Sequence, residues 1–323
     1  MLEVVEPGLL STVQDFGRSD AAEWGVPRGG ACDIWSLSMA NLLVGNRPDA
    51  AALEITLAGP TLRVLEGCLV GLAGADLGAR IVETGQRLEP GTSHLLQAGM
   101  TLAFGSAEER TGIRAYLALA GAIDVAQVLG SASTCLVGGF GGMSGRAVRL
   151  DDVMRQAAEA VTPRERRWPD DTTQPALEAA RGVIRVLPGP HRRRLASRSF
   201  ARLVGSEYRV SARGDRQGIV LDGTRLPGRE DAAPMLSQGV PWGAVQVPQD
   251  GHPICLLADH QTVGGYPVLA VVISADLPLL GQLGPGDPVR FSAVSGEEAV
   301  DALRRRQAEW QSALRALDEV DDG

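Results

Sequence analysis

The sequence predicts a mainly β protein with a few helices, built of barrels or sandwiches. Glycine makes up 40 of the 323 residues and occurs throughout the chain. Apolar residues alternate with others at 62–64, 68–72 and 289–291, as in strands with one buried face. Turn sequences such as 59–60 and 284–287 interrupt the runs at short intervals. Many short strands between frequent turns are typical of these two architectures.

Two helices are predicted in the first two hundred residues. Asp33 is placed to cap a helix over 34–44, and Gly45 follows directly after its end. Residues 193–204 have a helical composition and precede Gly205. Each segment therefore ends at a glycine, the residue that most often terminates a helix.

Two further helices are predicted near the C-terminus. Ser274 is placed to cap a helix over 275–283. Ser295 and Glu298 match a capping box at the start of the last helix. The apolar residues that follow keep a helical spacing: Val300, Leu303, Trp310, Leu314 and Leu317.

The length of the chain predicts two domains of roughly 150 residues each. Between 151 and 181 the composition shifts to Arg, Asp, Glu, Thr, Pro and Ala. We expect a β-rich N-terminal domain over 1–150, a connecting segment over 151–181, and a β-rich C-terminal domain with the last helix over 182–323.

Composition excludes several classes of function. The formal net charge of −8 argues against a nucleic-acid surface, which needs a basic patch. No apolar run approaches the roughly 18 residues of a membrane helix, and no secretory signal pattern opens the sequence. The four cysteines and four histidines show no zinc-ligand spacing, so no metal site is expected. We therefore expect a cytoplasmic protein with reduced cysteines.

All 31 basic residues are arginine, and this excludes specific chemistry. Without lysine the chain can form neither a Schiff base nor the phosphate-binding lysine of a P-loop. Biotin is carried on a lysine, so this chain cannot itself be a biotin carrier. ATP or carboxybiotin chemistry must therefore involve another polypeptide.

The segment 259–267 is the strongest candidate for a binding site. It connects two apolar runs, 254–258 and 268–273, that read as buried strands. It gathers polar residues around a glycine pair that allows close approach of a ligand: Asp259, Gln261, Thr262, Gly264, Gly265 and Tyr266. Asp259 has the chemistry of a base, and Tyr266 that of a donor to a developing oxyanion. Gln261 and Thr262 have side chains that can hold an amide or a carboxylate of a substrate. A polar hairpin with two turn glycines is the alternative.

Other polar residues stand in apolar surroundings. Gln14, Asp15 and Arg18 share one short segment, where they form either a site for an anion or a structural Asp–Arg bridge. Glu54, Asp76 and Gln246 lie in or at the ends of apolar strands, which calls for a partner or a ligand. The glycine-rich run 138–145 suits either an anion-binding nest or a tight loop of several turns.

Several segments together resemble the KipA family. They run in the family's order from about Leu2 to about Leu303: the opening segment, Thr12–Arg18, Gly25–Asp33, Asn41–Asn46, Ala52–Thr56, Gly243–Pro248 and Asp259–Pro267. The family includes the C subunit of 5-oxoprolinase, biotin-dependent carboxyltransferase proteins and proteins labelled allophanate hydrolase subunit 2. The resemblance implies two related β-barrel domains of cyclophilin-like character.

The resemblance also implies an enzyme subunit, active in ATP-dependent opening of 5-oxoproline to glutamate. Its partners would be a KipI-like subunit and a lactam-utilisation subunit, and ATP would bind with or on a partner. Two alternatives stay open: carboxyl transfer from carboxybiotin on a separate carrier to a urea-like amide, and binding of a KipI-like kinase inhibitor.

Residue types and resemblance together give the predicted site. Its catalytic residues are Asp259, Tyr266 and Asp15. Its substrate-binding residues are Gln14, Arg18, Asn41, Glu54, Asp76, Arg216, Gln246, Gln261, Thr262, Gly264 and Gly265. Asp215, Gln217 and Val268 depart from the family pattern, which has Asn, Met, and Lys or Arg at these places.

Overall fold

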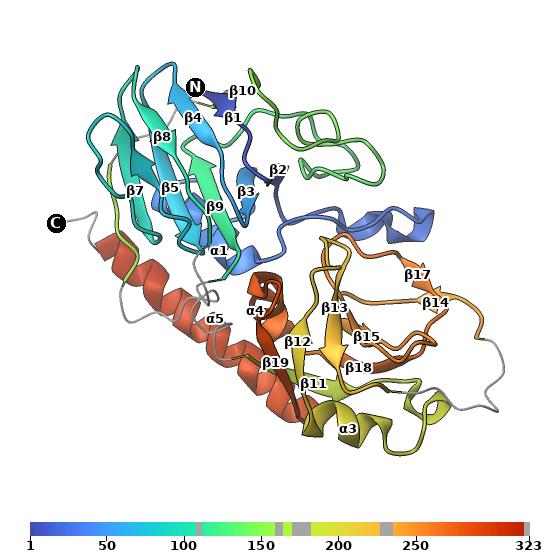
Figure 1. Ribbon diagram of the computed structural model, residues 1–323. Helices are drawn as coiled ribbons and strands as arrows, with labels where there is room; N and C mark the ends of the chain where they lie inside the picture. The colour runs from blue at the N-terminus through green and yellow to red at the C-terminus, as the bar shows by residue number, and fades with distance from the viewer. Residues whose placement is uncertain (108–111, 159–163, 170–181, 227–234, 320–323) are drawn as a thin grey trace. The chain divides into compact units, whose positions relative to one another are not determined.

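The computed structural model describes residues 1–107, 112–158, 164–169, 182–226 and 235–319, and its described part is mainly β (Figure 1). The chain divides into two compact units. The first comprises 1–18, 29–177 and 310–323, and the second comprises 19–28 and 178–309. Much of the predicted connecting segment 151–181 lies outside the described residues.

The first unit contains two five-stranded sheets. One has the strand order β10 (Val153–Met154), β1 (Leu2–Glu6), β4 (Thr61–Val64), β8 (Thr101–Ala103) and β6 (Arg80–Ile81). The other has the order β2 (Leu10–Gln14), β3 (Ala52–Thr56), β9 (Arg114–Leu119), β5 (Cys68–Gly74) and β7 (Thr92–Leu96). All pairings are antiparallel.

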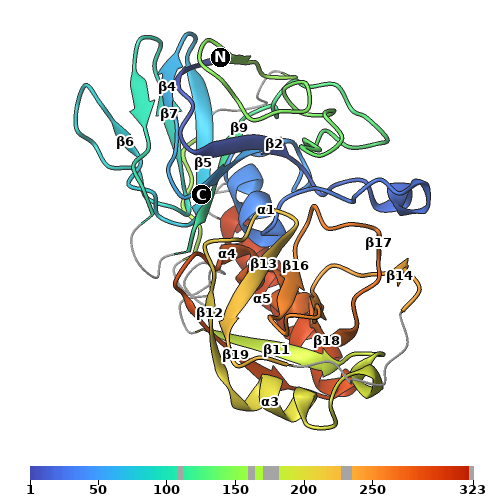
Figure 2. The same ribbon diagram turned by 45° about the vertical axis from the view of Figure 1, so that its right-hand side comes forward.

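The second of these sheets is buried on both faces. Val70 and Leu72 of β5 join a core with residues of the other sheet, such as Leu62 and Leu102. Leu69, on the opposite face of β5, packs in a second cluster that contains helix α1 (Ile34–Leu43). Figure 2 shows α1 beside β5 and β9. A strand between two apolar layers is apolar at successive positions, which explains the unbroken run of β5.

The helix α1 confirms the predicted cap. The Asp33 side chain accepts hydrogen bonds from the backbone N–H groups of Trp35 and Ser36, at 3.1 and 3.0 Å. Both groups belong to the first helical turn, where no helical carbonyl is available to them. The helix ends at Leu43, one residue before the predicted end.

Gly71 allows α1 to approach β5 closely. A Cβ at this position would lie 2.3 Å from the carbonyl oxygen of Ala40 and 3.0 Å from Cγ1 of Val44. We expect Gly71→Ala to lower the free energy of unfolding by about 1 to 3 kcal/mol, because the helix must move off the sheet. Urea denaturation measures the change. Gly67→Ala is the matched control, since the nearest atom to its Cβ lies at 3.5 Å. Equal effects of the two substitutions would contradict this account.

The second unit is built on a closed seven-stranded barrel (Figure 1). Its strand order is β11 (Val183–Pro188), β18 (Val268–Val272), β15 (Ala244–Gln246), β16 (Ile254–Leu256), β13 (Gly218–Gly223), β12 (Glu207–Val210) and β19 (Pro288–Ala293). The parallel pairing of β11 with β19 closes the barrel, and the other pairings are antiparallel. Val289 and Phe291 are buried while Arg290 is exposed, as the alternation predicts. A separate ribbon pairs β14 (Gln238–Gly239) with β17 (Val263–Gly264).

The predicted helix over 193–204 is wrong in its first half. A 3₁₀ turn covers Arg192–Arg194, and helix α3 begins only at Ser199 and ends at Gly205. Between them Leu195 is extended, with φ −103° and ψ 165°, and its side chain is 2% exposed. Burial of this leucine takes the chain out of the helical conformation.

The predicted helix over 275–283 is also divided. A 3₁₀ turn covers Ser274–Asp276, and helix α4 covers Leu277–Gln282. Pro278 lies in the first turn of α4, where its missing N–H costs no hydrogen bond. The side chain of Asp276 binds Arg185 instead of capping a helix, and Ser274 makes no capping hydrogen bond.

The C-terminal helix α5 covers Gly296–Glu319. Its capping box is formed as predicted, since Ser295 N donates to Glu298 at 2.7 Å and Glu298 N donates to Ser295 Oγ at 3.2 Å. In the described part of the chain no helix combines the length and apolar character needed to cross a bilayer.

Candidate functional site

The second unit contains a cavity of about 230 Å³ on the barrel strands β13, β15 and β16. Eight of the described residues line it: Asp215, Gln217, Gly218, Gln246, Ile254, Leu256, Gln261 and Tyr266. Gln246, Gln261 and Tyr266 are predicted site residues, and the structure brings these three together. The cavity is therefore the candidate functional site.

Two glutamine amides meet at this cavity. Gln246 lies on β15 between the buried residues Val245 and Val247, and it is only 1% exposed. Gln261 Nε2 donates to Gln246 Oε1 at 3.1 Å. Gln246 Nε2 is buried and has no hydrogen-bond partner among the residues that the structure describes. A buried donor left unpaired costs about 1 to 3 kcal/mol, so it is expected to be satisfied by a ligand or water.

Gly264 leaves room for the two amides. A Cβ on this residue would lie 2.7 Å from Gln246 Nε2 and 3.2 Å from Gln261 Nε2. At Gly265 the nearest atom to a Cβ would be 3.6 Å away. The first glycine of the predicted pair thus borders the amides directly, whereas the second has ordinary contacts.

The remaining residues of the segment 259–267 hold it in place. The carbonyl of Thr262 accepts a hydrogen bond from Val240 N at 3.1 Å. Tyr266 lines the cavity and is 48% exposed, so its ring stands at the entrance. His260 is buried, and its Nδ1 donates to the carbonyl of Gln261 at 2.7 Å. Burial lowers the pKa of His260, which favours its neutral form.

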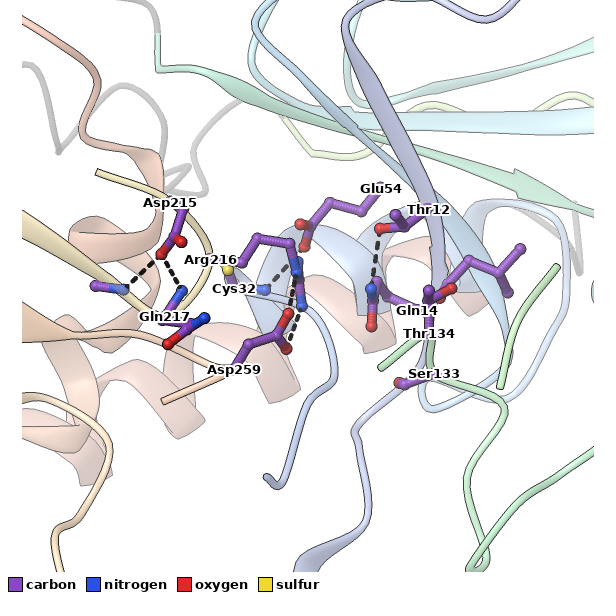
Figure 3. Close-up of polar contacts among 12 residues, drawn as sticks. Thr12, Gln14, Cys32, Glu54, Ser133, Thr134, Asp215, Arg216, Gln217 and Asp259 are labelled. Atoms are coloured by element: carbon purple, nitrogen blue, oxygen red, sulfur yellow. Dashed lines mark hydrogen bonds and ion pairs between the residues drawn. The ribbon is translucent and has the colours of Figure 1, made fainter. Parts of the chain in front are cut away.

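Asp259 and Arg216 form a buried bidentate ion pair (Figure 3). Arg216 Nε lies 2.9 Å from Asp259 Oδ2, and Nη2 lies 3.1 Å from Oδ1. The backbone N–H of Asp259 also donates to the carbonyl of Arg216 at 2.9 Å. Neither residue lines the cavity. The pair instead joins segment 259–267 to Asp215 and Gln217, which do line it.

Asp215 and Gln217 are lining residues that the sequence did not predict. Oδ1 of Asp215 accepts from the backbone N–H of Gln217 at 2.7 Å and of Gly218 at 3.3 Å. Figure 3 shows this turn at the start of β13. Both side chains line the cavity. One signal could have found them: both residues differ from the Asn and Met of the family pattern. Residues that contact a ligand differ between proteins that bind different ligands.

In the first unit, Glu54 is the centre of a buried network. Its Oε2 accepts from the backbone N–H of Cys32 at 2.9 Å (Figure 3). The same oxygen accepts from the hydroxyl of Tyr116 at 2.8 Å. Arg114 Nε lies 3.6 Å from Oε1. The Tyr116 hydroxyl also accepts from Asp33 N at 2.9 Å. Burial, followed by the charge of Glu54, raises the pKa of Tyr116 well above its ordinary value.

Asp15 and Arg18 do not form a bridge with each other in the described contacts. The Asp15 carboxylate accepts from Ser131 Oγ at 2.6 Å, from Ala132 N at 2.7 Å, from Gly17 N at 2.7 Å, and from Ser133 Oγ. Four donors thus hold the two oxygens of this carboxylate in place. Asp15 also lines a second cavity, of about 390 Å³, in this unit.

Arg18 is buried among backbone carbonyls. Its Nη2 donates to Ser133 O at 2.5 Å and its Nε to Val128 O at 3.3 Å. Its guanidinium lies 5.1 Å from the centre of the Phe140 ring, a cation–π contact. Arg18 therefore fixes the loop that contains Val128, Ser133 and Phe140.

The glycine-rich run 138–145 forms a tight loop of several turns. The backbone N–H groups of Gly139, Phe140, Gly142, Ser144 and Gly145 all donate to nearby carbonyls. These five N–H groups are used within the loop, which favours the tight loop of several turns over the anion-binding nest.

Three predicted residues of the first unit make local contacts. Gln14 Nε2 donates to Thr12 Oγ1 at 2.9 Å (Figure 3). Gln14 Oε1 is buried and pairs with none of the described residues. Asn41 donates to Ala50 O and accepts from Asn46, which ties the end of α1 to the following turn. Asp76 pairs with Arg87. None of these three lines either cavity.

All four cysteines are buried and unpaired with one another, as expected for reduced core residues. Among the described residues no group of three or more His, Cys, Asp or Glu side chains is arranged to hold a metal ion.

Comparison with known proteins relates the whole chain to one family. Residues 24–293 match the family model for the carboxyltransferase domain, subdomain A and B. The chain is 37% identical over 317 residues to the C subunit of 5-oxoprolinase from Escherichia coli, covering 95% of this chain and 96% of that protein. It is 30% identical over 319 residues to the C subunit of 5-oxoprolinase from Haemophilus influenzae, covering 99% of both.

A solved structure shares the fold over most of the chain. The Kluyveromyces lactis urea amidolyase superposes with a TM-score of 0.84 at 27% identity. The match covers 95% of this chain but only 19% of the much longer urea amidolyase chain.

Proposed function

This chain belongs to the carboxyltransferase-domain family that includes the C subunit of 5-oxoprolinase, and from that premise we propose that it is a subunit of an ATP-dependent 5-oxoprolinase. Such a complex opens the lactam ring of 5-oxoproline to give glutamate. The near-complete coverage of two relatives with that name supports the assignment. The observation in this chain that carries it is the unpaired amide donor of Gln246 at a small cavity.

Opening a lactam requires attack of water on a stable amide carbonyl. One water cleaves the C–N bond, and a second is consumed as ATP gives ADP and phosphate. In the proposed site Gln246 Nε2 donates to the lactam oxygen and stabilises the negative charge that develops there. Gln261 holds this amide by its bond to Gln246 Oε1, and Tyr266 closes the entrance. His260 positions Gln261 through the carbonyl of that residue.

Partner polypeptides complete the proposed reaction. Without lysine the chain lacks the usual phosphate-binding side chain of a P-loop, so we assign ATP to a partner subunit. A KipI-like subunit and a lactam-utilisation subunit are the proposed partners. The proposal places the complex in the cytoplasm, where ATP is supplied.

Carboxyl transfer to a urea-like amide is the second candidate. The similarity to urea amidolyase favours it, and urea is also a small amide that fits the cavity. The carboxybiotin would then come from a separate carrier. Binding of a KipI-like kinase inhibitor without catalysis is the third candidate.

Glutamate release from 5-oxoproline and ATP tests the proposal. The assay uses this chain with its KipI-like and lactam-utilisation partners, and the control omits only this chain. We expect release to require the chain, and Gln246→Leu to reduce turnover about 100-fold, as loss of one charge-stabilising donor does. Gly239→Ala is the control variant, because its Cβ would have no atom within 4 Å.

Release that continues without the chain would overturn the proposal. Urea-dependent decarboxylation of carboxybiotin in place of glutamate release would establish the second candidate. Association with the KipI-like protein with neither activity would establish the third.

A further inference from the structure

The geometry of the cavity points to a site that binds the C=O and N–H groups on one edge of an uncharged cis-amide. Any carboxylate of the ligand would stay at the entrance. As applied to 5-oxoproline, this inference rests on the proposed function. An amide constrained by a ring presents its C=O and N–H side by side on one edge. Open-chain secondary amides are trans and present these groups on opposite sides. A site that reads the cis edge must offer one donor and one acceptor.

The two glutamines offer such a pair. Their mutual bond uses Gln261 Nε2 and Gln246 Oε1, at 3.1 Å. This leaves Gln246 Nε2 as a buried donor that no described residue pairs with. It also leaves Gln261 Oε1 as an acceptor, which makes no hydrogen bond to any residue that the structure describes. The donor suits the carbonyl oxygen of a ligand, and the acceptor suits its N–H.

The charge of the lining argues against a carboxylate inside the cavity. None of the eight lining residues is arginine, lysine or histidine. Among these eight described residues the charged one is Asp215, which would repel a second carboxylate. The apolar side chains of Ile254 and Leu256 supply contact for a hydrocarbon ring. A carboxylate attached to that ring is therefore most stable in water at the entrance beside the half-exposed Tyr266.

The size of the cavity restricts the ligand further. At about 230 Å³ it is smaller than the roughly 300 Å³ at the lower end of sites for drug-sized molecules. A single five-membered ring, or urea itself, suits this volume. The chemical class is thus a small neutral lactam, cyclic urea or primary amide.

Binding of small probes to the purified full chain tests this inference by calorimetry or ligand-observed NMR. The probes are 5-oxoproline, 2-pyrrolidone, N-methyl-2-pyrrolidone, L-proline and urea. We expect 2-pyrrolidone, which lacks the carboxylate, to bind within about threefold of 5-oxoproline, because a solvated group adds little. N-methylation removes the N–H and is expected to weaken binding about tenfold. L-Proline, which has the carboxylate but no lactam carbonyl, is expected not to bind. If urea binds more tightly than 2-pyrrolidone, the same donor and acceptor are assigned to a urea-like ligand, as in the second candidate function.

Two variants and a control locate the binding. Gln246→Glu keeps the shape but replaces the donor by an acceptor, and it is expected to abolish binding of 2-pyrrolidone. Gly264→Ala crowds both amides and is expected to weaken binding at least about tenfold, since a misplaced buried donor loses its hydrogen bond. Gly239→Ala, on the strand paired with β17, is expected to bind as the parent chain does. Thermal unfolding confirms that each variant is folded.

Three results would overturn the inference. The first is binding of 5-oxoproline and L-proline but not of 2-pyrrolidone, which would show that the carboxylate is recognised inside. The second is binding of 2-pyrrolidone that Gln246→Glu does not change. The third is no binding of any probe to the folded chain. In each case glutamate release by the assembled complex separately decides the proposed function.

Discussion

Replacing Arg216 with methionine is expected to lower the free energy of unfolding by about 3 to 5 kcal/mol, the usual cost of leaving one charge of a buried ion pair uncompensated. The side chains of Arg216 and Asp259 are only 3% and 7% exposed, and their contact is bidentate. Because Asp259 would remain buried, its charge would lose its main stabilising partner. Urea denaturation at pH 7 measures the change.

A solvent-exposed pair in the same unit provides the control. Arg213 lies 3.1 Å from Asp222, and both side chains are more than half exposed. Arg213→Met is expected to change the free energy of unfolding by less than about 1 kcal/mol, because water and salt screen such pairs. If Arg213→Met and Arg216→Met lower the free energy of unfolding by similar amounts, burial does not explain the contribution of the Arg216–Asp259 pair.

Replacing Glu54 with alanine is expected to lower the free energy of unfolding by a similar amount, about 3 to 5 kcal/mol. The substitution removes the buried carboxylate beside Arg114, which is also the acceptor of Cys32 N and Tyr116 OH. Glu54→Gln keeps an oxygen that can accept from both donors, so its loss of unfolding free energy is expected to be smaller. Chemical denaturation of the two variants orders these contributions.

Asp76 supplies the matched control for Glu54. Its partner Arg87 is 58% exposed, and its own side chain is 30% exposed. Asp76→Ala is expected to cost less than about 1 kcal/mol. A stability of Glu54→Ala equal to that of the parent chain would show that Glu54 carries no structural role and would return it to the candidate ligand-binding residues.

The buried ion pair of Asp259 and Arg216 shows what residue type alone does not determine. Both residues have the chemistry of a catalytic site, and both lie in segments that contribute to the cavity. Their pairing across 43 positions of the chain appears only when β13 and β16 are joined in the barrel. Residue type predicts the capacity for catalysis, whereas the partner decides whether a carboxylate is available for it.

The lining residues Asp215 and Gln217 show the converse. They lie in a turn, which by itself carries no periodic signal, and the barrel brings that turn beside Gln246 and Gln261. The division of the predicted helices has a similar cause. Burial of Leu195 decides the local conformation there, against the helical tendency of its neighbours.

The sequence by itself determined the mainly β class, the caps of the first and last helices, and the family to which the chain belongs. These depend on alternation, on short-range hydrogen bonds and on motifs, which are local properties of the chain. Only the tertiary structure decided which polar residues face a cavity and which are bound to one another. That choice depends on contacts between residues far apart in sequence. The fold places Glu54 beside Arg114 and Arg216 beside Asp259, whereas no described residue pairs with the buried amide donor of Gln246.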